Sequence, residues 1–184
     1  MLRVLLAVTV VVLAAAVGTG VLVRKLQPTA GASGAVSIGN NPPPTLREQG
    51  PATIALVEDV AVHPEANRVR TLLQKYFDAI NAGDYPLWRS TVTPQRARDT
   101  GETVWRDQYR STLDGSIVLH RLEPRAGGGL VALLSFTSVQ DPADAPAELP
   151  VRCLRWWVSY PLIGEGDELR LSPASPSANL RVPC

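Results

Sequence analysis

A continuous apolar stripe that ends at a glycine constrains this chain more than any other feature of its sequence. Apolar side chains recur every three or four positions, at Val69, Leu72, Leu73, Tyr76, Phe77 and Ile80. This spacing places them on one face of an α-helix. Gly83 then supplies the left-handed residue that commonly ends a helix. The sequence therefore predicts a helix that begins near Pro64, packs on a core through this stripe, and stops at a sharp corner.

Two further helical regions follow the corner. Asp84 is suited to cap the second helix and Pro86 to open it, and Thr93 and Pro94 repeat this arrangement for the third. Gly101 weakens the middle of that third region. The side chains expected to face inward are Leu87, Trp88, Thr91, Val104, Trp105 and Tyr109. The folded part of the chain is thus expected to begin with three helices in succession.

After residue 115 the sequence changes from a helical to an extended pattern. Four segments are predicted as strands, at residues 116–124, 130–140, 151–162 and 168–172. Three consecutive glycines at 127–129 make a tight turn between the first two strands. Because the helices precede the strands rather than alternating with them, the order predicts an α+β fold with an antiparallel meander of about four strands.

The segment "YFDAINAGDYPLW", residues 76–88, carries a family resemblance. Together with the later helices and the strand meander, it resembles the NTF2-like superfamily, which includes SnoaL-like and ketosteroid-isomerase-like proteins. The resemblance covers residues 64–172, and the overall layout is similar to secreted or membrane-anchored actinobacterial members. It implies a curved antiparallel sheet wrapped around the first helix, so that a cone forms with a pocket at its open end.

The N-terminus carries an uncharged apolar segment that is long enough to cross a membrane. Val4–Val23 is 20 residues long and has basic residues on both sides. As a helix, such a segment spans the roughly 30 Å of hydrocarbon in a bilayer. We therefore expect residues 1–25 to form a single-pass anchor in the cell membrane, with the rest of the chain extracytoplasmic. The alternative is a signal segment cleaved near residues 14–16, which would make the protein secreted.

A Pro/Gly-rich stretch, residues 26–53, separates this segment from the folded part. It holds five prolines and four glycines, with few apolar residues and no periodicity. Such a stretch buries too little surface to offset its ordering entropy, so we expect a flexible linker. The NTF2-like domain is then expected at residues 54–184. Its first residues, up to 62, are apolar enough to dock onto it as a strand or a helix.

The chain has two cysteines, Cys153 and Cys184, and an even pair indicates one disulfide in an oxidising compartment. Along the strand at 151–162, Trp156 lies on a more apolar face and Trp157 on a mixed face, because successive side chains point to opposite sides. The disulfide is expected to lay the tail, residues 172–184, across the mixed face and to cover Trp157. In the alternative, Trp157 is an exposed anchor for a partner.

Few side chains stand out as pocket or catalytic residues. The pocket candidates are Tyr76, His120, Trp156 and Tyr160. For His120 the alternative is a structural role with a hydrogen-bonded ring. No catalytic residue is assigned, because the nearest further acids, Asp78, Asp114 and Glu123, cannot be matched to the catalytic positions of ketosteroid-isomerase-like proteins.

The charge distribution argues against nucleic acid as a partner. Three of the 18 basic residues precede residue 26, which leaves 15 basic against 17 acidic groups rather than a clustered basic surface. The arginines at 96, 98, 106 and 110 alternate with acidic residues, which favours a solvated face over an anion site. Because His63 and His120 are the only histidines, a metal site lacks ligands, and no cofactor is expected.

Together these features predict a non-enzymatic binding or interaction domain of the bacterial cell envelope, with a small apolar ligand or an envelope protein as its partner. The low density of inward acids and bases favours this function. The alternative is a small-molecule isomerase, cyclase or hydrolase that uses the cone pocket. The resemblance also implies a homodimer through the open sheet as an alternative mode of assembly.

Overall fold

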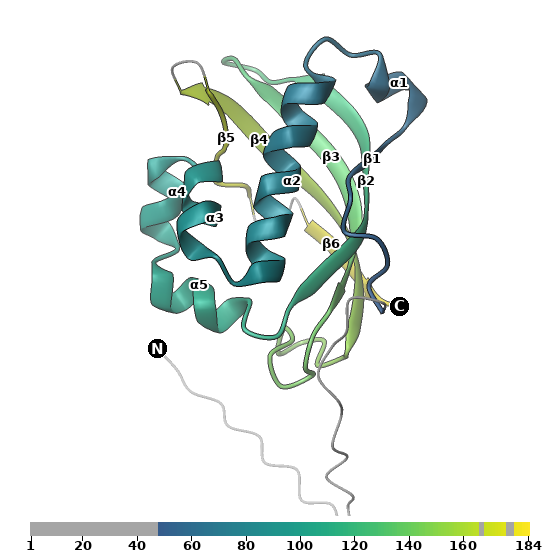
Figure 1. The fold of residues 1–184 in the computed structure, drawn as a ribbon, viewed down its shortest axis with the longest axis vertical. Coiled ribbons are helices and arrows are strands. Elements are labelled where there is room, and N and C mark those ends of the chain that lie inside the picture. The colour runs from purple at the N-terminus through teal and green to yellow at the C-terminus, as the bar shows by residue number, and fades with distance from the viewer. Residues whose placement is uncertain (1–47, 166–167, 176–178) are drawn as a thin grey trace, which may run out of the picture. The chain divides into compact units, whose positions relative to one another are not determined.

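The fold is α+β, with helices placed before a mixed sheet of six strands (Figure 1). It is taken from a computed structural model, which describes residues 48–165, 168–175 and 179–184. The predicted anchor, residues 1–25, and the linker up to residue 47 lie outside the described residues. Within the described parts, no helix has both the length and the apolar character needed to cross a membrane.

The helices and strands follow one another in a simple order. The helices are α1 (Glu58–Ala61), α2 (Ala66–Ala82), α3 (Tyr85–Thr91), α4 (Pro94–Asp99) and α5 (Glu102–Gln108). The strands are β1 (Ala55–Leu56), β2 (Leu113–Pro124), β3 (Leu130–Val139), β4 (Cys153–Glu165), β5 (Glu168–Leu171) and β6 (Asn179–Pro183). The sheet runs β1-β2-β3-β4, and both β5 and β6 pair with β4. The prediction of an antiparallel sheet of about four strands missed β1, which is parallel to β2, and β6.

The predicted stripe forms the buried face of α2, which lies against the sheet (Figure 1). The helix ends at Gly83, which has a left-handed backbone with φ of 63°, and this confirms the predicted corner. The next helix begins at once, because the Asp84 carboxylate accepts a hydrogen bond of 2.9 Å from the Leu87 backbone N–H. The start of α2 was predicted two residues too early, at Pro64 instead of Ala66.

The third helical region divides at Gly101 into α4 and α5. Thr93 caps α4 as predicted, since its hydroxyl accepts a hydrogen bond of 3.2 Å from the Arg96 N–H. Trp105 is buried at 1% exposure, but the prediction that Val104 faces inward is wrong, because Val104 is 52% exposed. Neighbouring residues on a helix lie about 100° apart, so a short helix that buries Trp105 turns Val104 to solvent.

Two irregularities in pairing bend strand β2. The register against β3 shifts between Gly115 and Val118 and again between Leu119 and Arg121. Ser116, inside the first shift, has a positive φ of 49°. Extra residues of this kind bend a strand and increase its twist, so they account for the curvature that β2 shows around α2 (Figure 1).

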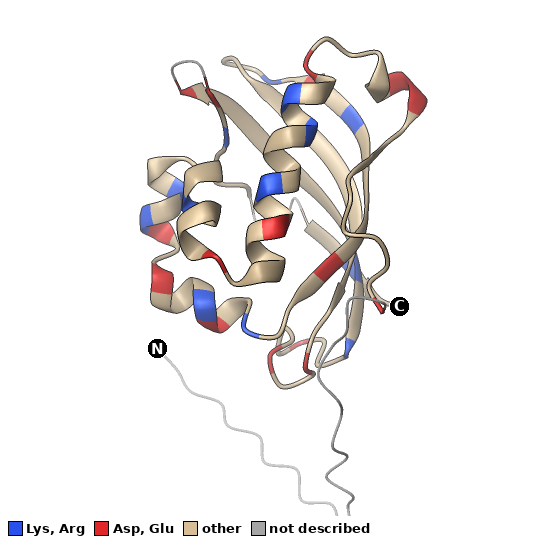
Figure 2. Cartoon of the chain, viewed as in Figure 1, with Lys and Arg blue, Asp and Glu red and all other residues tan. Residues whose placement is uncertain are grey.

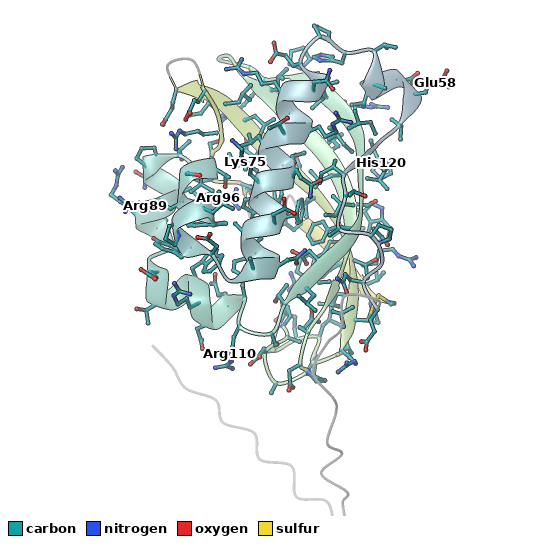
Figure 3. The ribbon with its side chains drawn as sticks, in the orientation of Figure 1. Glu58, Lys75, Arg89, Arg96, Arg110 and His120 are labelled. Atoms are coloured by element: carbon teal, nitrogen blue, oxygen red, sulfur yellow. A yellow bond between two sulfur atoms is a disulfide. The ribbon has the colours of Figure 1, made fainter. Side chains whose placement is uncertain are left out.

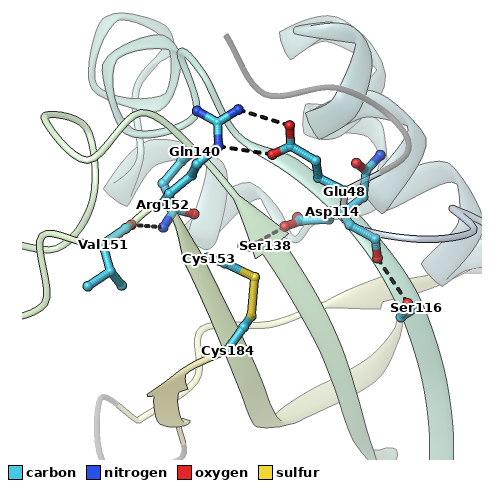
Figure 4. The surroundings of a disulfide bond; sticks show 10 residues. Glu48, Asp114, Ser116, Ser138, Gln140, Val151, Arg152, Cys153 and Cys184 are labelled. Atoms are coloured by element: carbon cyan, nitrogen blue, oxygen red, sulfur yellow. Dashed lines mark hydrogen bonds and ion pairs between the residues drawn. A yellow bond between two sulfur atoms is a disulfide. The ribbon is translucent and has the colours of Figure 1, made fainter. Parts of the chain in front are cut away.

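The predicted disulfide between Cys153 and Cys184 is confirmed (Figure 4). The tail, however, does not lie across the face of β4. It forms β6, which pairs edge to edge with β4 and sets Leu180 opposite Trp157. Pairing in the sheet gives hydrogen-bond partners to backbone groups along the edge of β4. A tail laid across the face of the strand would leave those groups unpaired. Trp157 therefore stays 39% exposed, and Leu180 beside it is 63% exposed.

The end of the predicted linker packs on the sheet. Gln49 is buried, and its carbonyl accepts a hydrogen bond of 2.9 Å from the Ser116 hydroxyl. Glu48 forms an ion pair of 2.9 Å with Arg152 (Figure 4). Residues 48–51, at the end of the stretch predicted as a linker, are therefore bonded to the folded part of the chain.

The turn between β2 and β3 offers a matched pair of glycine substitutions. Gly128 and Gly129 both have positive φ values, of 99° and 88°. A methyl group on Gly128 would meet no atom within 4 Å, whereas one on Gly129 would lie 2.2 Å from the Leu162 carbonyl oxygen. We expect Gly128→Ala to cost about 1–2 kcal/mol of unfolding free energy and Gly129→Ala about 1–3 kcal/mol more, measured by urea denaturation. Equal costs would contradict the close approach to Leu162.

Candidate functional site

A cavity of about 690 Å³ opens between the helices and the inner face of the sheet. Its size falls within the range of small-molecule sites. The lining comes from α2, α4, the end of α5, strands β2, β3 and β4, the loop after β3, and the tail. The lining side chains on which the site depends are Tyr76, Arg96, Tyr109, Asp114, Phe136, Ser138, Trp156 and Tyr160.

The inner face of β3 and β4 forms an aromatic wall. Alternate residues of a strand point to the same side, which brings Trp156, Val158 and Tyr160 to the cavity from β4. Phe136 of β3 pairs with Trp156 across the strands, and their rings stack with centroids 6.0 Å apart and planes at 10°. This side of the cavity is therefore mainly aromatic and apolar.

Three of the four predicted pocket residues meet at this cavity, and the fourth does not. Tyr76, Trp156 and Tyr160 line it. His120 is exposed on β2, on the side of the molecule away from Arg96, and its Nε2 is 2.7 Å from the Ser135 hydroxyl (Figure 3). His120 falls at the second register shift of β2, which breaks the alternation and turns both Leu119 and Leu122 to the core. The prediction that His120 lines the pocket is therefore corrected.

Arg96 is carried by α4 (Figure 3). Its side chain lines the cavity and contacts two tyrosines. Its Nη2 donates a hydrogen bond of 2.9 Å to the Tyr76 hydroxyl, and Nη1 is 3.5 Å from the Ser172 carbonyl oxygen. The guanidinium carbon lies 5.3 Å from the Tyr76 ring centroid and 5.4 Å from that of Tyr160. The capping of α4 by Thr93 fixes the helix that carries Arg96.

Arg96 was interpreted from the sequence as part of a solvated face, and the structure corrects this for Arg96 alone. The nearby Arg98, Arg106 and Arg110 are exposed and interact with neighbouring polar or acidic side chains, as expected. Basic and acidic residues are indeed interspersed over α4 and α5 (Figure 2). The local charge pattern gave no signal that one arginine of the four turns inward, because that depends on the break at Gly101 and on tyrosines distant in sequence.

Two tyrosines, the buried Tyr160 and the half-buried Tyr109, keep their protons in this site. Burial, reinforced by the nearby Tyr76, raises the pKa of Tyr109 and of Tyr160 well above the ordinary range. Both hydroxyl groups therefore remain neutral at physiological pH and retain a hydrogen to donate. The cavity thus combines a permanent cation with neutral hydroxyl donors.

Asp114, at the start of β2, is the most deeply buried carboxyl group of the cavity, at 2% exposure. Its side chain accepts a hydrogen bond from the Ser138 hydroxyl (Figure 4). The Asn81 amide of α2 bonds both the N–H and the carbonyl of Asp114, at 2.6 and 2.9 Å, and so fixes its backbone. Burial raises the pKa of Asp114 to about 7, against the opposing effect of the Ser138 hydrogen bond.

Aromatic, hydroxyl, carboxyl and guanidinium groups make up the lining of the cavity. In the part of the chain that the structure describes, no group of three or more histidine, cysteine or acidic residues could hold a metal ion. The sequence matches no protein-family model, and no curated protein matches it either. The groups that determine the chemistry of the site are its aromatic walls, one inward arginine, neutral tyrosines and one carboxyl group with a pKa of about 7.

Proposed function

We propose that this chain is an extracytoplasmic ligand-binding domain of the NTF2-like cone type, tethered to the cell membrane by its N-terminal segment. The observation that carries the proposal is the cavity of about 690 Å³ between α2, α4 and the inner face of the sheet. Apolar and aromatic walls with a few convergent polar groups are typical of small-molecule sites. A ligand is favoured over a protein partner because these polar groups point inward.

The disulfide supports a location outside the cytoplasm. Disulfides persist in oxidising compartments and are rare in the cytosol, so Cys153–Cys184 indicates export. Val4–Val23 supplies either an anchor or a secretion signal, and both would deliver the domain to the outside. The anchor is favoured because the apolar run continues to Val23, beyond the small residues at 14–16 where a signal segment would be cut.

The cone type is supported by two further features. One long helix, α2, packs its apolar stripe against the sheet, with the short helices α3, α4 and α5 gathered on one side of it (Figure 1). The two register shifts in β2 bend the strand that closes one side of the cavity. These features agree with the resemblance carried by residues 76–88.

A second candidate function is proton-transfer catalysis of the isomerase kind, and Asp114 is the observation that favours it. A pKa of about 7 is suited to a general base at physiological pH. Binding remains the stronger proposal because the Asp114 carboxyl already accepts the Ser138 hydroxyl. The other acids of the cavity lining, Asp99 and Asp144, are each engaged with another side chain.

The binding proposal is tested with N-phenyl-1-naphthylamine, a neutral aromatic dye whose fluorescence increases in apolar surroundings. The protein should bind it saturably with one-to-one stoichiometry. Val158→Phe adds volume on the inner face of β4 and should weaken dye binding about tenfold, or ~1.4 kcal/mol. Ser159→Phe adds a ring at the next position, on the opposite face, and should leave the affinity unchanged. Equal binding by all three proteins would contradict the cavity as the ligand site.

A further inference from the structure

We propose that the cavity binds an organic anion, an aromatic carboxylate or sulfonate, and that Arg96 recognises its charged group. The inference rests on the proposed ligand-binding function and specifies the chemistry of the ligand. It is carried by the position of Arg96, by the groups around it, and by the aromatic wall beside it.

Arg96 has no carboxylate partner within 4 Å among the residues that the structure describes. All 17 acidic residues except Asp167 belong to those described parts. Other arginines of the chain do have such partners: Arg181, whose guanidinium lies 5.3 Å from the Trp156 ring centroid, pairs with Glu148. Arg98 on the same helix also lacks a carboxylate partner in the described parts of the chain, but it is exposed and bonds Gln95. Arg96 therefore differs from Arg98 in holding its charge inside the cavity without a counter-ion.

The guanidinium also has donors left over. It carries five N–H groups, and the hydrogen bonds to Tyr76 and Ser172 engage two of its nitrogens. A planar guanidinium matches a carboxylate or a similar oxyanion with two parallel hydrogen bonds. Tyr109 and Tyr160 line the same cavity, and each also interacts with the Tyr76 hydroxyl. Their hydroxyl groups are neutral, so they do not repel an anion bound at Arg96.

The apolar surroundings of Arg96 strengthen its attraction for an anion. A cation among aromatic and apolar groups loses much of its hydration, and an opposite charge offsets that cost more effectively there than at an exposed surface. Three acidic side chains also line the cavity, but each has a partner. Asp144 pairs with Arg110, and Asp99 accepts a hydrogen bond from Gln95. The Asp114 carboxyl accepts a hydrogen bond from the Ser138 hydroxyl.

The wall beside Arg96 defines the rest of the ligand. Phe136 and Trp156, whose rings stack on each other, line the cavity as an apolar aromatic cluster, against which an aromatic ring packs favourably. Tyr160 and Val158 continue this face along β4 towards the Arg96 guanidinium, which lies 5.4 Å from the Tyr160 ring centroid. A flat ligand with one anionic end would place its ring on the wall and its charge at Arg96.

Two dyes that differ by a single charged group test this. 8-Anilinonaphthalene-1-sulfonate has the ring system of N-phenyl-1-naphthylamine with a sulfonate added. The wild-type protein should bind the sulfonate at least about tenfold more tightly than the neutral dye. Arg96→Met should remove that preference and leave the affinity for the neutral dye within about twofold. Arg98→Met removes the same charge from the exposed face of α4 and should alter neither affinity.

Arg96→Lys is a second variant that keeps the positive charge but loses the planar guanidinium, and it should retain part of the preference for the sulfonate dye. It therefore separates loss of the charge from a folding defect in Arg96→Met. Near-ultraviolet circular dichroism checks the fold of each variant. If the neutral dye binds, but the sulfonate is not preferred and Arg96→Met changes nothing, the anion site is overturned while the binding function stands. If neither dye binds saturably to the wild-type protein, both proposals are overturned.

Discussion

Replacing both cysteines, in the double variant Cys153→Ser and Cys184→Ser, should lower the free energy of unfolding by about 3.5 kcal/mol. The disulfide joins residues 31 positions apart. In the chain-entropy model, a cross-link that closes a loop of this length removes about 3.5 kcal/mol of conformational entropy from the unfolded state. The loop contains β4, β5 and β6. Among the strands of the described sheet, β5 and β6 each pair only with β4, so both should lose protection along with the overall stability. Urea denaturation followed by tryptophan fluorescence measures the loss.

Hydrogen exchange in β6 distinguishes the local effect of losing the disulfide from a general loss of stability. β6 is a short edge strand, held by backbone pairing with β4 and by the ion pair of Arg181 with Glu148 in the loop before β4. Without the disulfide, amide hydrogens of β6 should exchange faster than those of β3, which has a paired strand on each side. Adding a reductant to the wild-type protein should reproduce the double variant. A stability loss below about 1 kcal/mol would show that strand pairing alone holds the tail.

The parts of the fold that were predictable are those fixed by nearby residues. The stripe of α2, its end at Gly83 and the cap at Asp84 all depend on side chains a few positions apart, and each was predicted. The hairpin turn at 127–129 likewise depends only on residues next to one another in the sequence. Strand β6 is different, because it pairs with a strand more than twenty residues earlier and its own sequence has little apolar periodicity. Its direction beside β4 could not be derived from the tail alone.

In the candidate site, too, the residues placed by local pattern were predicted and those placed by long-range contacts were not. Trp156 and Tyr160 were assigned to one face by simple alternation along β4, and that strand has no register shift against β3. His120 was misassigned because one extra residue in β2 exchanges the two faces of the strand beyond it. Arg96 was missed because its surroundings, Tyr76, Tyr160 and Ser172, come from three other parts of the chain. Contacts of this range are set by the fold and not by local pattern.

Asp114→Asn should make the protein more stable at pH 8 by about 4 kcal/mol and leave its stability at pH 4 nearly unchanged. The pKa of Asp114 is raised by burial from an ordinary value near 3.8 to about 7. Between these two values, the unfolded chain has released a proton that the folded protein still holds. Rising pH therefore favours unfolding throughout this window, by about 1.4 kcal/mol for each pKa unit. An asparagine carries no charge, so it removes this penalty while its oxygen can still accept the Ser138 hydroxyl.

The test is urea denaturation of both proteins at several pH values from 4 to 8. The difference in unfolding free energy should grow with pH and level off above pH 7, where folded and unfolded Asp114 are both ionised. Asp144→Asn provides a control of opposite sign. Hydrogen bonds from Arg110 and Ser111 lower the pKa of Asp144, so its contribution to stability is present at neutral pH and is lost as the pH falls. If Asp114→Asn instead gave the same stability difference at pH 4 and pH 8, the carboxyl would have to be ionised in the folded protein throughout. A nearby positive charge would then have to offset the cost of burying the ionised carboxylate of Asp114. Arg96 is the cationic side chain that lines the same cavity.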